Sequence, residues 1–174
     1  MEQAEKSKGK SLLRISTTRF GDISIDEARV IQMRDGMLGF DHLKRYALLM
    51  HGKKIPFSWL QSIEDGSIAF VVINAFVVKP DYEPVISDDE VKLLEIASPE
   101  DAVLFSVVTI RSDPFKVTAN LRAPIVINAK KMLAKQVVLV ESDYSVHYPI
   151  TENKVFLEEK AYGKAEIIPS ALAM

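Results

Sequence analysis

Short apolar runs, each bounded by a turn signal, recur along this 174-residue chain about every 8–12 residues. In one clear case the run Phe57 to Ile63 is followed by Glu64-Asp65-Gly66 and then by the run Ile68 to Asn74. Two apolar runs joined through Asp-Gly are typical of an antiparallel hairpin, because glycine adopts the positive φ of a tight turn. The spacing therefore predicts a mostly β protein, a small antiparallel β-barrel or β-sandwich with one or two short helices.

The same reasoning places the individual strands. Arg34-Asp35-Gly36 and Gly52-Lys53-Lys54 indicate further turns, the first of them a tight hairpin connection. Pro124 cannot donate a hydrogen bond to a neighbouring strand, so it belongs at the start of a strand, at an edge or in a bulge. We expect strands at residues 12–16, 23–25, 28–33, 45–50, 57–63, 68–74, 102–111, 115–120, 124–128, 136–140 and 145–147.

One segment carries the signals of a helix. Ser87 and Glu90 form a capping box, in which the serine oxygen accepts from a free amide and the glutamate reaches back. Asp88 and Asp89 lie in the first turn, where the helix dipole favours negative charge. Because Pro99 follows the last apolar residues, we expect a short helix of about three turns.

Composition places the chain among soluble globular proteins. Apolar residues make up 48% and charged residues 26% of the sequence, which is enough to bury one core. The formal charge of −2 argues against a general nucleic-acid binder, which would carry a basic excess. The lack of cysteine excludes disulfides and thiolate metal sites and fits a reducing compartment. No run has the length of a signal peptide or a spanning helix, so we expect a cytoplasmic protein without a membrane role.

The chain is expected to form one folded domain with a tail at each end. Residues 1–11 are lysine-rich and lack periodicity, which predicts a disordered tail. Residues 12–150 hold the expected strands and form a single β domain. Residues 151–174 form a C-terminal extension whose apolar patches, Val155 to Leu157 and Ile167-Ile168, either dock against the body or stay loose.

Residues capable of catalysis form no recognisable motif. The histidines His42, His51 and His147 lack metal-ligand spacing. No serine lies in G-x-S-x-G, and there is no cysteine to pair with a histidine. Residues 36–39 match the G-x-x-G of an RNA-clamping loop, but a β-turn precedes them where that loop needs a helix, so we interpret them as a hairpin connection. The sequence predicts neither an enzyme nor a cofactor or metal site.

Two groups of residues allow either a structural or a binding interpretation. Asp88, Asp89 and Glu90 begin the densest acidic region of the chain. This region is either a solvated helix face or a surface that meets a basic partner and opposes RNA phosphates near it. Phe76 and Tyr82 lie in an apparently irregular segment, where aromatic residues are either core residues or exposed interface anchors.

One segment has a more distinctive residue pattern than the rest of the chain. The run from Ala119 to Asn128 (ANLRAPIVIN), with Gln136 and Leu139 beyond it, closely resembles the signature of the FliW family of flagellar assembly factors. The chain departs from the family pattern at Leu38 and in the pair 75–76, where the family commonly has proline; both lie in turns. Further segments that resemble the family, in its order, are residues 36–40, 56–57, 60–62, 81–83, 144 and 148–150.

The resemblance implies a small β-rich protein that binds the RNA-binding regulator CsrA and also flagellin. Such a protein would bind CsrA without competing for its RNA site, relieve its repression of flagellin mRNA, and release CsrA when flagellin binds, with no direct contact to nucleic acid. The residues that we assign to partner binding are Phe76, Tyr82, Glu83, Asp88, Asp89 and Glu90. The family-motif residues to which we assign a structural role are Gln61, Asn120, Pro124, Asn128 and Gln136.

Two alternatives remain open at this point. A small-molecule-binding β-barrel or a minor enzyme would use a pocket among the strands, and would need convergent polar groups in a cavity. The sequence nominates no such groups. A flagellin chaperone without an effect on CsrA would differ from the first interpretation only in its range of partners.

Overall fold

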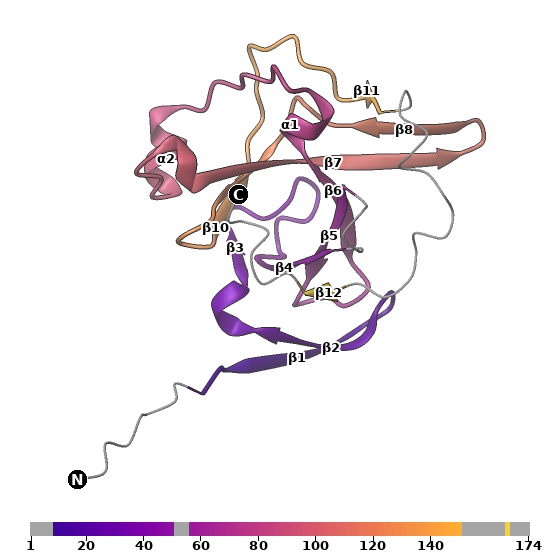
Figure 1. The fold of residues 1–174 in the computed structure, drawn as a ribbon, viewed down its shortest axis with the longest axis vertical. Helices are drawn as coiled ribbons and strands as arrows, with labels where there is room; N and C mark the ends of the chain where they lie inside the picture. Colours follow the sequence, from indigo (N-terminus) through magenta and orange to yellow (C-terminus); the bar gives the residue numbers. More distant parts are fainter. Residues whose placement is uncertain (1–8, 51–55, 151–165, 168–174) are drawn as a thin grey trace.

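The computed structural model of the protein describes residues 9–50, 56–150 and 166–167. The described chain is mostly strand, and seven strands close into a barrel (Figure 1). The strands follow one another in the order β7-β6-β5-β4-β3-β10-β9, and β9 pairs with β7 to close the ring. The barrel strands are β3 (Ile31–Met33), β4 (Arg45–Met50), β5 (Phe57–Ser62), β6 (Ala69–Asn74), β7 (Ala102–Ser112), β9 (Ile125–Asn128) and β10 (Leu133–Gln136).

The remaining elements lie outside the barrel. Strands β1 (Leu12–Thr17) and β2 (Gly21–Asp26) form a separate ribbon, and β8 (Phe115–Ala119) and β11 (Tyr148–Pro149) extend the sheet beyond β7. Strand β12 (Glu166–Ile167) pairs with β4, so this part of the C-terminal extension joins the body. The helical turns are α1 (Ala75–Val78), α2 (Asp88–Leu93), η1 (Glu27–Arg29) and η2 (Pro99–Asp101). None of the helices in the described ranges is long and apolar enough to cross a lipid bilayer.

Two pairings give the barrel its shape. Strand β7 is long enough to pair with three other strands. Its first residues pair with β9, its middle residues with β6 and its last five with β8. The β7–β8 hairpin therefore projects beyond the barrel (Figure 1). Strands β3 and β10 pair in parallel, with Leu133 opposite Gln32 and Ala134 opposite Met33. This pairing joins two segments about 100 residues apart, as parallel strands require a long connection.

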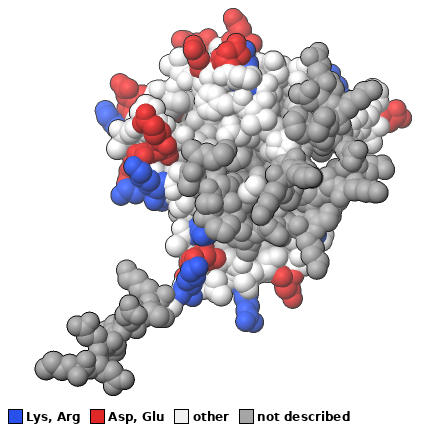
Figure 2. All heavy atoms as spheres, in the orientation of Figure 1, with Lys and Arg blue, Asp and Glu red and all other residues white. Residues whose placement is uncertain are grey.

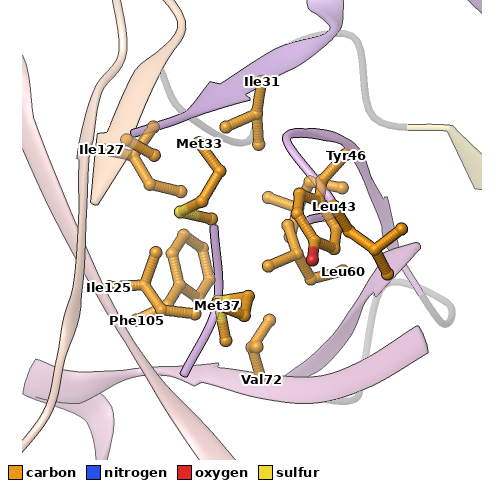
Figure 3. Close-up of a cluster of buried hydrophobic side chains, with 12 residues drawn as sticks. Ile31, Met33, Met37, Leu43, Tyr46, Leu60, Val72, Phe105, Ile125 and Ile127 are labelled. Carbon is orange, nitrogen blue, oxygen red and sulfur yellow. The ribbon is translucent and has the colours of Figure 1, made fainter. Parts of the chain in front are cut away.

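Alternating side chains fill the interior of the barrel. Along β5, Leu60 packs inside, whereas its neighbour Trp59 packs in a cluster on the outer face. Side chains from all seven strands and from the loop after β3 meet in the centre (Figure 3), as in other small barrels. The interior cluster consists of Ile31, Met33, Met37, Leu43, Tyr46, Leu48, Leu60, Val72, Phe105, Ile125, Ile127 and Ala134.

The β1–β2 ribbon covers the outer face of β4, β5 and β6. The ring of Phe20 meets the ring of Trp59 edge to face at 5.7 Å, and the Arg19 guanidinium lies 4.2 Å above the same indole. The ribbon approaches the β5–β6 turn so closely that a Cβ on Gly66 would lie 1.9 Å from the carbonyl oxygen of Ser16. Glycine is therefore required at this turn.

The structure confirms the expected fold class and several of its parts. Strands β5 and β6 are antiparallel across the Asp-Gly turn, and β7 and β8 are antiparallel across the turn that holds Pro114. Helix α2 begins after Ser87, whose hydroxyl accepts from the Glu90 amide and donates to its carboxylate. Pro124 immediately precedes β9, where its missing donor costs nothing.

Three predicted strands were wrong in position. The strand expected at 28–33 begins only at Ile31, because residues 28 and 29 belong to η1. The Asp26 carboxylate accepts from the Ala28 amide and caps this helical turn. The strand expected at 136–140 is β10, which ends at Gln136; the amide of Val137 instead bonds to the carbonyl of Pro124. The strand expected at 145–147 lies at Tyr148–Pro149.

Three further predictions were wrong. The β3–β4 connection and helix α2 differ from their expected lengths, and helix α1 was not predicted. Asp35 and Gly36 have the positive φ of a turn, at 63° and 73°, but the connection from β3 to β4 spans residues 34–44 and is not a tight hairpin. Helix α2 has six residues, less than the three turns expected. The segment after Asn74 contains α1, which the Asn74 side chain caps by accepting from the Phe76 amide. The predicted turn at 52–54, most of the N-terminal tail and the patch at 155–157 lie outside the described residues.

Candidate partner-binding surface

Two stretches of chain, residues 75–97 and 137–148, cross the outside of the barrel, and we call them the outer layer. They lie above β7 at the top of Figure 1 and include α1 and α2. Helices of four and six residues are unstable alone, so the layer depends on packing against the barrel. The shared cluster consists of Ala75, Tyr82, Leu94, Leu104, Leu121, Val126, Val137 and Leu139.

Tyr82 holds the two stretches together. Its side chain is only 2% exposed, and its hydroxyl donates to the carbonyl oxygen of Leu121 at 2.6 Å. Its ring lies 4.7 Å from the ring of Tyr144, whose hydroxyl accepts from the Glu83 amide at 3.0 Å. Burial, with Tyr144 nearby, raises the pKa of Tyr82 far above its ordinary value, so the hydroxyl stays a donor. Tyr82 is therefore not the exposed anchor that one interpretation of the sequence allowed.

Phe76 differs from Tyr82 in exposure. Its ring lies 6.1 Å from that of Tyr82, and 44% of the residue is exposed. Val77 follows it in α1 with 52% exposure, and Val85 is 86% exposed. Three more valines on the second stretch are also exposed: Val138, Val140 and Val146. The outer layer thus presents apolar side chains to solvent, which is a feature of many protein interaction surfaces.

The outer layer is strongly acidic. Its two stretches contain eight carboxylates and two lysines, a formal charge of −6, whereas the whole chain carries −2. Figure 2 shows acidic side chains gathered at the top of this face. Glu83, Asp88 and Asp89 are exposed. Exposed carboxylates beside exposed apolar residues would suit a partner with a basic, partly apolar surface.

Not every acidic residue of the layer is available to a partner. The carboxylate of Glu90 lies 3.5 Å from the Lys135 ammonium and accepts from the Ser87 hydroxyl. The carboxylate of Asp81 accepts from Lys79 at 2.7 Å, and this hydrogen bond lowers the pKa of Asp81 and raises that of Lys79. Glu90 is therefore only partly exposed and already paired within the molecule, where its contact with Lys135 connects α2 to β10.

The family-motif amides bond to backbone groups of loops. Asn128 donates to the carbonyls of Leu94 and Glu95 and accepts from the amides of residues 130 and 131. Gln136 accepts from the Leu38 amide at 2.9 Å and donates to the Ala123 carbonyl at 3.2 Å. Asn128 therefore fastens the end of α2 to the barrel, and Gln136 fastens the loop after β3.

The other two amides have similar contacts. The side chain of Gln61 donates to the carbonyls of Ser62 and Ile68 and, at 3.3 Å, to that of Gly66, which closes the β5–β6 turn. Asn120 accepts from the amides of residues 122 and 123 and so shapes the approach to β9. The motif was visible in the sequence, but the groups that these amides bond to were not.

The described residues offer no group suited to metal binding. No group of three or more histidine and carboxylate side chains is placed to hold a metal ion in these ranges. The interior, where a barrel-type ligand would bind, is occupied by the side chains shown in Figure 3.

Comparison with known proteins agrees with this architecture. The FliW protein family matches residues 14–150 of the chain. The chain belongs to the FliW family. The flagellar assembly factor FliW of Syntrophus aciditrophicus is 53% identical over 145 residues, which cover 83% of this chain and 92% of that protein. The FliW of Geobacter sulfurreducens is 42% identical over 153 residues, covering 88% of this chain and 92% of that protein.

A crystal structure of the flagellar assembly factor FliW has the same fold. It superimposes with a TM-score of 0.72 at 34% identity, covering 82% of this chain and 99% of that one. The family match includes the barrel strands β3 to β10 and the whole outer layer, since all of them lie within residues 14–150.

Proposed function

We propose that this protein is a flagellar assembly factor that binds the translational regulator CsrA and relieves its repression of flagellin mRNA. It also binds flagellin, and flagellin releases CsrA in a partner switch. Membership of the FliW family across residues 14–150 carries the proposal. The acidic and apolar character of the outer layer supports it, because such a surface suits a partner that binds RNA phosphates through basic residues.

The mechanism needs no chemistry beyond coupled binding. A carboxylate-rich surface held against CsrA would repel RNA phosphates within the Debye length, about 8–10 Å at physiological salt. A coupling of about 1–3 kcal/mol lowers RNA affinity by about 5–150-fold. Linkage makes the coupling reciprocal, so RNA would weaken the binding of this protein to CsrA by the same factor.

Calorimetric titration with CsrA from the same organism tests the proposal, first alone and then with saturating flagellin. We expect binding in the micromolar range or tighter, abolished by flagellin, and weakened as salt rises. An RNA gel shift should then show weaker CsrA–RNA binding in the presence of this protein. Binding to neither partner would contradict the proposal, and binding to flagellin alone would leave a chaperone without the regulatory role.

Two substitutions locate the surface. Glu83→Lys reverses an exposed charge of the outer layer, and Phe76→Ala removes an exposed aromatic anchor. We expect each to weaken CsrA binding by about tenfold, the loss typical of an interface anchor. The matched controls are Asp41→Lys and Leu12→Ala, which change exposed residues of the same kinds outside the outer layer. Equal losses in the controls would place the binding surface elsewhere.

A further inference from the structure

The projecting end of the β7–β8 hairpin carries two like charges directly opposite each other. Arg111 on β7 pairs with Lys116 on β8, and both are exposed. Opposite residues of an antiparallel pair have Cβ atoms about 4.5–5.5 Å apart, and like charges there destabilise the pairing. Neither side chain forms an ion pair with an acidic residue of the described chain. This arrangement is unfavourable unless an anion joins it.

A small hollow lies beside these two cations. It measures about 50 Å³ and is lined by Arg111, Lys116, Thr118 and His147. A single water needs about 10–15 Å³, so the hollow accepts one small group, of the size of a carboxylate or a phosphate. His147 comes from the segment that leads into β11, which pairs with β8 at Thr118.

Thr118 supplies a hydroxyl to the hollow. The residue is 5% exposed and lines the hollow, and no hydrogen bond joins its hydroxyl to another described residue. A hydroxyl donor with a guanidinium and an ammonium beside it is suited to an oxyanion.

We propose that this hollow, at the basic end of the hairpin, binds a carboxylate side chain from an acidic segment of a protein partner. The opposite face of the hairpin favours a protein, because Ile110 and Phe115 are 41% and 56% exposed there and would serve as apolar anchors. The hollow shares only His147 with the outer layer. Its basic side chains suit an acidic partner, whereas the outer layer suits a basic one.

Amide-resolved NMR titration of the full chain tests the site with the capped tetrapeptide EFEE and its neutral counterpart QFQQ. We expect EFEE to shift the amides of Lys116, Thr118 and His147, and QFQQ to bind about tenfold more weakly because it lacks the charge. The double variant Arg111→Gln with Lys116→Gln should abolish the shifts. The control Arg14→Gln, which removes an exposed strand arginine on the ribbon, should retain them.

Thr118→Val separates binding from folding. The two side chains have nearly the same shape, so the variant should keep its melting temperature while it binds EFEE several-fold more weakly. Unchanged peptide shifts in the double variant, or equal binding of EFEE and QFQQ, would overturn the proposal. Binding of a ten-nucleotide RNA at these amides in place of the peptide would also overturn it, because the occupant would then be a nucleic acid.

Discussion

The barrel and the outer layer are held together by different interactions. Continuous backbone ladders and an interior of apolar side chains hold the barrel. In the outer layer two short helices and irregular chain are held by side chains such as Tyr82, which donates to the Leu121 carbonyl, and Asn128, which donates to the carbonyls of Leu94 and Glu95. Regions with few ladder bonds open locally at lower free energy than a core. The outer layer is therefore expected to open locally more readily than the barrel.

The largest effect should come from the barrel interior. Leu60 is 1% exposed and packs within the interior cluster, so Leu60→Ala should lower the free energy of unfolding by about 2–5 kcal/mol through lost burial and a cavity. Urea unfolding measures this loss. Because the barrel carries the outer layer, the amides of both regions should exchange faster. Faster exchange in the outer layer alone would contradict the view that the barrel supports the outer layer.

A smaller and more local effect should follow from Asn128→Ala. The change leaves the carbonyls of Leu94 and Glu95 without their donor, in a position that is 1% exposed. We expect a loss of about 2 kcal/mol and faster hydrogen exchange in α2. Asn120→Ala is the control, since Asn120 accepts two hydrogen bonds but its side chain makes none to the outer layer. It should leave exchange in α2 unchanged.

Tyr46→Phe should have the opposite sign and the smallest size. The Tyr46 hydroxyl is buried in the barrel without a partner among the described residues, so its removal should stabilise the protein by about 1 kcal/mol at pH 7. Burial, helped by the charge of Glu64, raises the pKa of Tyr46 from 10.0 to about 12.

The raised pKa of Tyr46 makes the difference in stability between the original protein and Tyr46→Phe depend on pH. The folded state holds the phenolic proton more tightly than the unfolded state does. The free energy of unfolding of the original protein is therefore unaffected by this proton below pH 10.0 and falls as the pH rises toward about 12. The advantage of Tyr46→Phe over the original protein should therefore grow between pH 10 and about 12. Unfolding curves at pH 7 and at pH 10.5 measure this growth, and an advantage that is the same at both pH values would show that the Tyr46 pKa is not raised and that the hydroxyl is solvated.

Structural features that depend on neighbouring residues, such as hairpins and helix caps, were predictable from the sequence. Features that depend on contacts between distant residues were not. The hairpins β5–β6 and β7–β8 follow from turn residues between two apolar runs, and α2 follows from its cap. Strand β10 was misplaced because Asn128 accepts from the amides of residues 130 and 131 and turns the chain back early. No local pattern shows that Met33 will pair with Ala134.

The candidate surface was predictable in charge but not in geometry. Asp88 and Asp89 are acidic in any fold, and their exposure follows from the start of a helix. The burial of Tyr82 depends on Tyr144 and Leu121, which are separated from it by many residues. Aromatic residues in a segment without clear periodicity can therefore be assigned to core or surface only once the partner segment is placed.

The parallel contact between β3 and β10 also sets the order of events during synthesis. Residues 31–33 leave the ribosome early, but the strand that completes their side of the ring ends at Gln136. Until then β3 has an unpaired edge on that side, and β9 lacks its partner β10. Contacts between segments so far apart form slowly, because much of the chain must be ordered first. A nascent chain that ends before Gln136 therefore cannot close the ring, and the outer layer gains its full support only after that residue has been synthesised.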